Sequence, residues 1–202
     1  MLGSVEIRGM TRSAFLMRGA LAAGTAYGAA AVGPFVGRSL AATGAGDEAI
    51  LQFALGLEQL EAAFYKKAVA VKGLSPEVER ALKEIAEHEA AHAKQLDQTL
   101  QQLGATPGPA PKASFPALAG EGAVLKLAVA LEETGVGAYN GAAPAIRSAD
   151  LLSAVGSIVQ VEARHAGVLR ELAGQDPSPV AFDKALSRDE AEARIKPLAG
   201  GQ

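Results

Sequence analysis

The stretch Glu87–Leu96, EHEAAHAKQL, and its partial copy Val161–Leu169, VEARHAGVL, decide the fold that this sequence predicts. Each stretch contains the motif Glu-x-x-His. Residues three positions apart lie one turn apart on the same side of a helix, so the carboxylate and imidazole of one motif can bind a single metal ion. The chain has 3 histidines, and two of them belong to this motif: Glu89 with His92, and Glu162 with His165.

The two motifs belong to a longer internal repeat. Their glutamates are 73 positions apart, and so are their histidines. Upstream, LEQLEAAFY (Leu57–Tyr65) matches LEETGVGAY (Leu131–Tyr139), with a leucine, a glutamate and a tyrosine recurring 74 positions apart. We therefore expect two copies of a helix pair, with Glu58 or Glu132 on the first helix and Glu-x-x-His on the second. Four carboxylates and two imidazoles pointing inward between four helices form the di-metal site of ferritin-like bundles.

The hydrophobic pattern predicts four long helices, near residues 47–71, 76–103, 121–143 and 149–172, and a short fifth helix at 187–196. The segment between the second and third helices, GATPGPAPKASFPALAG, holds four prolines and cannot be helical throughout. A hinge between domains is one interpretation. Neither helix pair could bury its polar-lined face alone, which favours a crossover along one bundle. The predicted fold is all-α: a ferritin-like four-helix bundle of two hairpins joined by a long crossover, with a short C-terminal helix.

The candidate metal ligands lie on apolar helical stripes. A carboxylate there is costly unless it is paired, hydrogen-bonded or bound to a cation, although a purely structural polar network is the alternative. Glu58 and Glu132 would be terminal ligands. Glu89 and Glu162 would bridge two metal ions, and one neutral imidazole would complete each position. Glu61, one turn after Glu58, either replaces or joins it. The predicted ligand set is Glu58, Glu89, His92, Glu132, Glu162 and His165.

Neighbouring polar residues receive other expected roles. Tyr65 and Tyr139 are expected to fill the bundle interior, with hydrogen bonding to the ligands or redox activity as the alternative. His88 is expected to have a surface or supporting role rather than to bind metal. Glu133 should point away from the apolar stripe and be solvated.

Residues 1–42 are expected to be an N-terminal export signal outside the fold. Arg8 and Arg12 precede an uncharged run rich in Ala and Gly, which small residues follow. A retained membrane anchor is the alternative, but the run is weakly apolar for a permanent span. TRSAFL (Thr11–Leu16) resembles a twin-arginine signal, although Ser13 stands where the second arginine should be. The predicted domains are the signal at 1–42, the bundle at 43–174 and a tail with the short helix at 175–202.

The composition excludes several classes of partner. Hydrophobic residues make up 49% of the chain and aromatic residues 4%, which favours a helical protein. The chain has no cysteine, which excludes disulfides and thiolate metal sites. The formal net charge is −3 and no basic patch is present, so we expect no nucleic acid partner. A membrane would be met only through the N-terminal signal.

Four stretches, LEQLEAAFYKKA, EHEAAHAKQL, ALEETGVGAYNGAAP and VEARHAGVL, resemble the helix signatures of exported bacterial ferritin-like proteins, close to the desiccation-related group. The resemblance covers Asp47 to Leu172. It implies a four-helix bundle with a non-haem centre of two Fe ions or two Mn ions held by carboxylates.

Such a centre leads to three functional hypotheses. The first is an exported oxidoreductase of ferroxidase or peroxidase type, which would meet dioxygen or peroxide in the periplasm, in the cell envelope or outside the cell. The second is a non-catalytic stress or structural bundle. The third is a metal-storage assembly. The sequence does not distinguish iron from manganese, and it leaves a homo-oligomer open.

Overall fold

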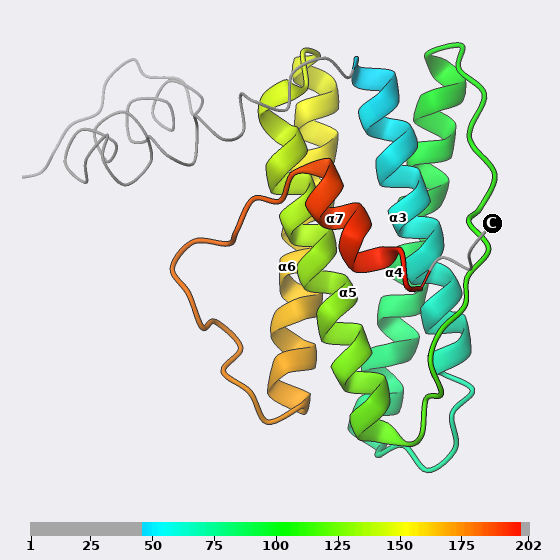
Figure 1. The fold of residues 1–202 in the computed structure, drawn as a ribbon, viewed down its shortest axis with the longest axis vertical. Coiled ribbons are helices and arrows are strands. Elements are labelled where there is room, and N and C mark those ends of the chain that lie inside the picture. Colours follow the sequence, from blue (N-terminus) through cyan, green and yellow to red (C-terminus); the bar gives the residue numbers. More distant parts are fainter. Residues whose placement is uncertain (1–45, 199–202) are drawn as a thin grey trace, which may run out of the picture. The chain divides into compact units, whose positions relative to one another are not determined.

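The computed structural model describes residues 46–198, which form helices joined by irregular segments, with no β-strand among them (Figure 1). The elements are α3 (Asp47–Ala68), α4 (Pro76–Gln102), α5 (Glu121–Ala142), the 3-10 helix η1 (Ala143–Ala145), α6 (Ala149–Leu172) and α7 (Arg188–Ile195). The predicted export signal, residues 1–42, lies outside the described residues. Among the described helices, none is both long and apolar enough to cross a membrane.

The four long helices form two hairpins. Helix α3 packs chiefly along α4, and α5 packs chiefly along α6. The irregular segment between α4 and α5 runs along the bundle and connects the hairpins (Figure 1). Gly104 and Gly120 lie at its two ends with φ of +78° and +84°, a backbone conformation that glycine adopts without strain. The predicted fold class, a ferritin-like four-helix bundle with a short C-terminal helix, is confirmed.

Two apolar clusters make up the core of the bundle. One contains Phe64, Leu82 and Leu169, and the other contains Leu51 and Val155. On each long helix the buried residues of one cluster precede the glutamate that the repeat analysis identified, and those of the other cluster follow it. The polar side chains of the repeat therefore lie in a layer near the middle of the bundle, between apolar walls.

The C-terminal segment packs onto a glycine-lined face of α5. The backbone N–H of Leu186 donates to the carbonyl oxygen of Gly137 at 2.8 Å. A Cβ added at Gly141 would lie 1.8 Å from the carbonyl oxygen of Leu186, so only glycine permits this approach. Helix α7 then begins with a capping box, in which Ser187 and Glu190 each bond the backbone N–H of the other.

Candidate metal centre

Six polar side chains meet in the layer between the two apolar clusters. Helix α3 supplies a glutamate, α4 a glutamate and a histidine, α5 a glutamate, and α6 a glutamate and a histidine: Glu58, Glu89, His92, Glu132, Glu162 and His165. The four glutamates are 0% exposed and His165 is 5% exposed, while the side chain of His92 is 12% exposed. All six residues that the sequence singled out as metal ligands therefore lie in one buried cluster.

The potential ligand atoms form two overlapping groups. Within each group, one carboxylate oxygen or ring nitrogen from each residue lies within 4.8 Å of the others. The first group is Glu58, Glu89, His92 and Glu162, and the second is Glu89, Glu132, Glu162 and His165. Glu89 and Glu162 belong to both groups. Buried carboxylates and imidazoles brought together in this way are compatible with metal binding.

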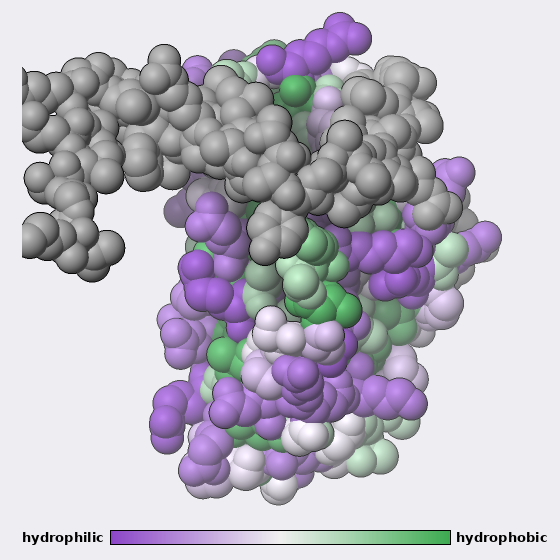
Figure 2. Space-filling model, turned by 90° about the vertical axis from the view of Figure 1, so that its left-hand side faces the viewer, coloured by the Kyte–Doolittle hydropathy of each residue, from purple (hydrophilic) through white to green (hydrophobic). Residues whose placement is uncertain are grey.

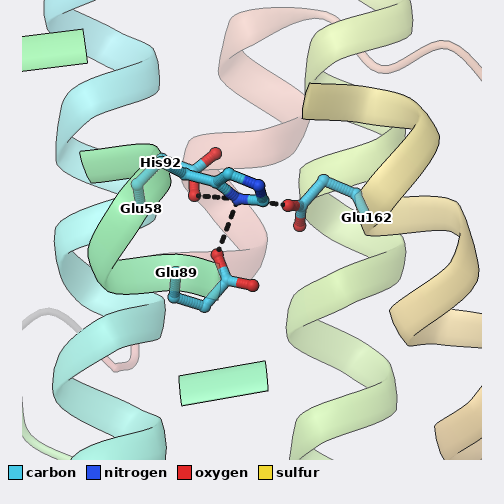
Figure 3. A group of neighbouring side chains, drawn as sticks. All are labelled: Glu58, Glu89, His92 and Glu162. Carbon is cyan, nitrogen blue, oxygen red and sulfur yellow. Dashed lines mark ion pairs between the residues drawn. The ribbon is translucent and has the colours of Figure 1, made fainter. Parts of the chain in front are cut away.

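His92 lies at the centre of the first group (Figure 3). Its Nδ1 atom is 2.9 Å from Oε1 of Glu162, 3.3 Å from Oε2 of Glu58 and 3.4 Å from Oε2 of Glu89. The three carboxylates come from three different helices, so side chains from α3, α4 and α6 surround one ring nitrogen.

His165 faces the second group through the same ring nitrogen, Nδ1. Its Nδ1 atom is 3.0 Å from Oε1 of Glu89 and 3.3 Å from Oε2 of Glu132. Although these distances are short, Nδ1 of each histidine lacks a hydrogen-bond partner among the described residues. At least one oxygen of each glutamate in the two groups also lacks one there. Buried polar atoms without partners are rare in proteins. Here these atoms lie close to one another around a common space, as ligand atoms around a metal ion do.

The two histidines are cationic in the absence of metal. Burial alone would lower the pKa of His92, but the close carboxylates, Glu162 foremost, raise it to about 12. Burial opposes the same effect at His165, whose pKa is raised to about 10 by the carboxylates of Glu132 and Glu89. Each ring is therefore protonated on both nitrogens at neutral pH. The carboxylate-rich cluster attracts positive charge strongly enough to outweigh the cost of burying it.

The glutamates divide into ionised and protonated members. Burial would raise the pKa of Glu89, but contacts with His165 and His92 lower it to about 2. Burial raises the pKa of Glu162 to about 8 and that of Glu58 well above 4.5. The metal-free cluster thus holds protons on several of its potential ligand atoms, and a bound cation would displace them.

Two tyrosines connect the hairpins through the glutamates of the first helices. The hydroxyl of Tyr65 on α3 donates to Oε1 of Glu132 on α5, and the hydroxyl of Tyr139 on α5 donates to Oε1 of Glu58 on α3. The two rings are 0% and 4% exposed, as expected for residues that fill the interior. Burial and the adjacent glutamates raise the pKa of both phenols well above 10, so both remain donors.

Glu61, the open alternative to Glu58, lies beside the cluster but outside both groups of ligand atoms. It is 2% exposed. Burial, and then the charges of Glu162 and Glu132, raise its pKa well above 4.5. Gly135 leaves the space that its carboxylate needs, since a Cβ there would lie 3.2 Å from Oε1 of Glu61. Glu58 therefore lies in the first group, and Glu61 is a fifth buried carboxylate next to it.

Comparisons with known proteins agree with the fold. The chain matches the model of the ferritin-like domain over residues 46–175. A conserved hypothetical protein from Mycobacterium tuberculosis has a similar solved structure, with a TM-score of 0.56 and 21% sequence identity over 67% of this chain and 96% of that chain. At this identity the likeness shows the fold alone. Comparison with curated proteins finds none that matches. Because the family model spans more than half of the chain and includes all four long helices, this chain belongs to the ferritin-like domain family.

Proposed function

We propose that this chain is an exported di-metal carboxylate protein that oxidises ferrous iron with dioxygen or peroxide and so protects the cell envelope from oxidative stress. The observation that carries the proposal is the pair of overlapping ligand groups, which share Glu89 and Glu162. Carboxylates common to two adjacent groups are suited to bridging a pair of metal ions, which is how two-metal sites are built. Carboxylate and imidazole donors without thiolate suit iron or manganese.

The geometry suggests a role for each ligand. Glu58 and His92 would complete one metal position, and Glu132 would complete the other together with His165. Each histidine would bind through Nδ1, the ring nitrogen that lies beside the carboxylates. On binding, each ring gives up its Nδ1 proton. The four carboxylates then balance two divalent cations within apolar walls.

The surrounding residues would hold the ligands in place while the charge of the site changes. Tyr65 and Tyr139 hold one oxygen of Glu132 and Glu58, respectively, so the terminal carboxylates are braced from the opposite hairpin. The apolar clusters on either side limit access of water. When bound, iron or manganese supplies a one-electron redox couple at each position.

The electrons and protons of the proposed reaction balance with peroxide or dioxygen as the co-substrate. Two ferrous ions lose one electron each and become ferric. Hydrogen peroxide takes up these two electrons and two protons from solution, its O–O bond breaks, and two waters form. Dioxygen would instead take up two electrons and two protons to form hydrogen peroxide.

The proposal is tested by adding Fe(II) anaerobically to the metal-free protein, measuring the iron retained per chain, and then adding peroxide or air. We expect ferric iron to form faster than in buffer alone. Glu89→Ala removes a carboxylate common to both groups and should abolish this acceleration. Glu87→Ala, on the exposed face of the same helix, is the matched control and should retain it. Circular dichroism checks folding, and Glu162→Gln is a milder second variant.

The alternatives give different results in the same experiments. A wild-type chain that retains no iron and does not accelerate oxidation would contradict the proposal and favour a non-catalytic bundle. Retention of Mn(II) but not Fe(II) would point to a manganese centre. Elution of a large iron-loaded assembly from a sizing column would favour metal storage. Export is tested separately by N-terminal sequencing of the protein isolated from the cell envelope. The sequence obtained should begin near residue 43.

A further inference from the structure

A surface pocket between α4 and α6 lies behind the candidate metal centre. Its volume is about 230 Å³, and its walls include Glu84, His88, Val161, Arg164 and His165. His165 also belongs to the second ligand group. One edge of its ring therefore faces the metal centre through Nδ1, while the other edge reaches the wall of the pocket.

The outer edge of His165 contacts His88. Nδ1 of His88 is 2.9 Å from Nε2 of His165, and the two ring planes are inclined by only 10° with their centroids 5.2 Å apart. The distance between the nitrogens is shorter than the roughly 3.5–4.0 Å of an ordinary van der Waals contact between carbons. The two rings are therefore joined edge to edge by a hydrogen bond rather than stacked face to face.

A metal ion bound to His165 would fix the direction of this hydrogen bond. If Nδ1 of His165 gives its lone pair to a metal ion, the neutral ring carries its remaining proton on Nε2. That N–H then donates, and Nδ1 of His88 accepts. Histidines that bind metals usually donate their other N–H to a carboxylate, a backbone carbonyl or water, which fixes the ring orientation and makes the ligand more basic. Here a second imidazole is the acceptor.

The repeat does not provide the same support for His92. The position equivalent to His88 in the second helix pair, 73 residues later, is Val161. A valine side chain has no atom that accepts a hydrogen bond. The two halves of the centre have matching ligands, but only the His165 half has an imidazole behind its histidine.

We propose that His88 is a positioning residue for His165, and that the hydrogen bond between the two rings makes the His165 position bind its metal ion more tightly than the His92 position. This inference rests on the proposed function because it requires the metal centre. It concerns the order and affinity of metal binding, which the ligand set alone does not determine.

The affinities of the two metal positions are measured one at a time by titrating Mn(II) into the metal-free full chain in two variant backgrounds. His92→Ala leaves the His165 position as the main site, and His165→Ala leaves the His92 position. In the first background, His88→Leu should weaken Mn(II) binding about 10- to 100-fold, the usual effect of losing such a supporting hydrogen bond. In the second background, the same change should alter the dissociation constant by less than about twofold, because His165, the hydrogen-bond partner of His88, is already absent there and the pairwise contribution has been removed.

Two further variants separate positioning from a general structural effect. His88→Asn places an amide oxygen near the position of Nδ1 and should restore most of the affinity. Val161→Leu changes an apolar wall residue of the same pocket and should leave both positions unchanged. In the Zn(II)-loaded protein, nitrogen NMR should show the Nε2–H tautomer of His165 in all three proteins, and the Nε2 proton should exchange with solvent more slowly in wild type and His88→Asn than in His88→Leu.

Equal weakening in both backgrounds, or no weakening in the His92→Ala background, would overturn the role of His88 while leaving the metal centre intact. Failure of His88→Asn to restore affinity would also overturn it. A wild-type chain that takes up no Mn(II), Fe(II) or Zn(II) would overturn the proposed function and the role of His88 with it.

Discussion

Removing the hydroxyl of Tyr139 tests how the protein holds its terminal carboxylates. This phenol on α5 donates to Glu58 on α3, and its ring is 4% exposed. Tyr139→Phe therefore deletes one buried hydrogen bond with little change in packing. Tyr65→Phe deletes the repeat-related hydrogen bond to Glu132.

The cost of Tyr139→Phe should depend on whether metal is bound. Without metal, burial and the nearby acidic groups raise the pKa of Glu58 well above its usual value, which favours the neutral carboxyl group. A hydrogen bond to a neutral group contributes about 0.5–1.5 kcal/mol to the free energy of unfolding, and one to a charged group about 1.5–3 kcal/mol. Metal binding makes Glu58 anionic. The difference of about 1–1.5 kcal/mol must appear as metal binding that is roughly 5- to 10-fold weaker.

Denaturant unfolding of wild type and Tyr139→Phe, with and without Mn(II), measures both costs, and direct Mn(II) titration measures the change in affinity. Tyr65→Phe is the matched comparison and should show an effect of similar size at the other metal position. Two outcomes would refute the reasoning: the same loss of stability with and without Mn(II), or an unchanged dissociation constant.

Three further predictions follow from the charges and the packing. Glu61→Gln should stabilise the metal-free protein increasingly above pH 4.5. Folding raises the pKa of Glu61, so this residue's contribution to stability is present below its unfolded pKa and is lost as pH rises, whereas glutamine does not titrate. In urea unfolding at several pH values, the free energy of unfolding of the variant relative to wild type should rise by at most about 1.4 kcal/mol per pH unit. Mn(II) binding should tighten as pH rises and release at least about three protons per chain near neutral pH, because metal-free His92, His165 and Glu162 have pKa values of about 12, about 10 and about 8. An indicator dye measures the release. Gly141→Ala should displace the C-terminal segment, because the new Cβ would lie 1.8 Å from the carbonyl oxygen of Leu186. The free energy of unfolding should fall by about 1.5–3 kcal/mol, which is the contribution of burying one leucine side chain. Proteolysis of residues 175–187 should become faster.

A control variant or a contradicting outcome checks each of these predictions. Gly122→Ala, on the same helix as Gly141, adds a Cβ with no atom within 4 Å and should cost nothing. If both alanine variants behave alike, the packing of Leu186 on α5 is not the cause. Glu61→Gln should retain Mn(II) binding, and its loss would place Glu61 among the ligands. Metal uptake without proton release would contradict the cationic state of His92 and His165.

The parts of the fold that follow from local pattern could be predicted from the sequence. The separation of three residues places Glu89 and His92 on one face of a helix. The repeat indicates that Glu58 and Glu132, on the first helix of each pair, face the same polar layer. The bounds of α6 agree with the prediction, and α3 ends at Ala68, three residues earlier than expected. The motif and the helix ends are determined within one or two turns of a helix, and the repeat needs only a comparison of two segments of the sequence.

Contacts between helices could not be predicted in the same way, because they depend on how far one helix is shifted along its neighbour. Tyr65 finds its acceptor 67 residues away. Glu133, expected to be solvated, instead pairs with Arg170 on α6, with Nε 2.6 Å from Oε1. Its side chain is 37% exposed. Glu133 therefore points away from the apolar stripe as expected, but the expectation that it has no charged partner was wrong.

The burial of Glu61 has a signal in the sequence that lies outside the Glu-x-x-His motif. Gly135 stands 74 positions after Glu61, at the equivalent place in the repeat. One helix carries an extra carboxylate there and its counterpart carries no side chain, and the structure brings the two positions together. His88 and Val161 are a second such pair. Differences between repeat copies therefore indicate where the two halves of the centre are not equivalent.

Elemental analysis of protein purified without added metal measures the number of metal ions per chain and so tests the two-metal centre directly. The two overlapping ligand groups should hold about two iron or manganese ions per chain. Glu89→Ala should lose them, while Glu87→Ala should keep them. Fewer than one ion per folded wild-type chain, or full retention in Glu89→Ala, would contradict the central claim that the shared carboxylates hold a two-metal centre.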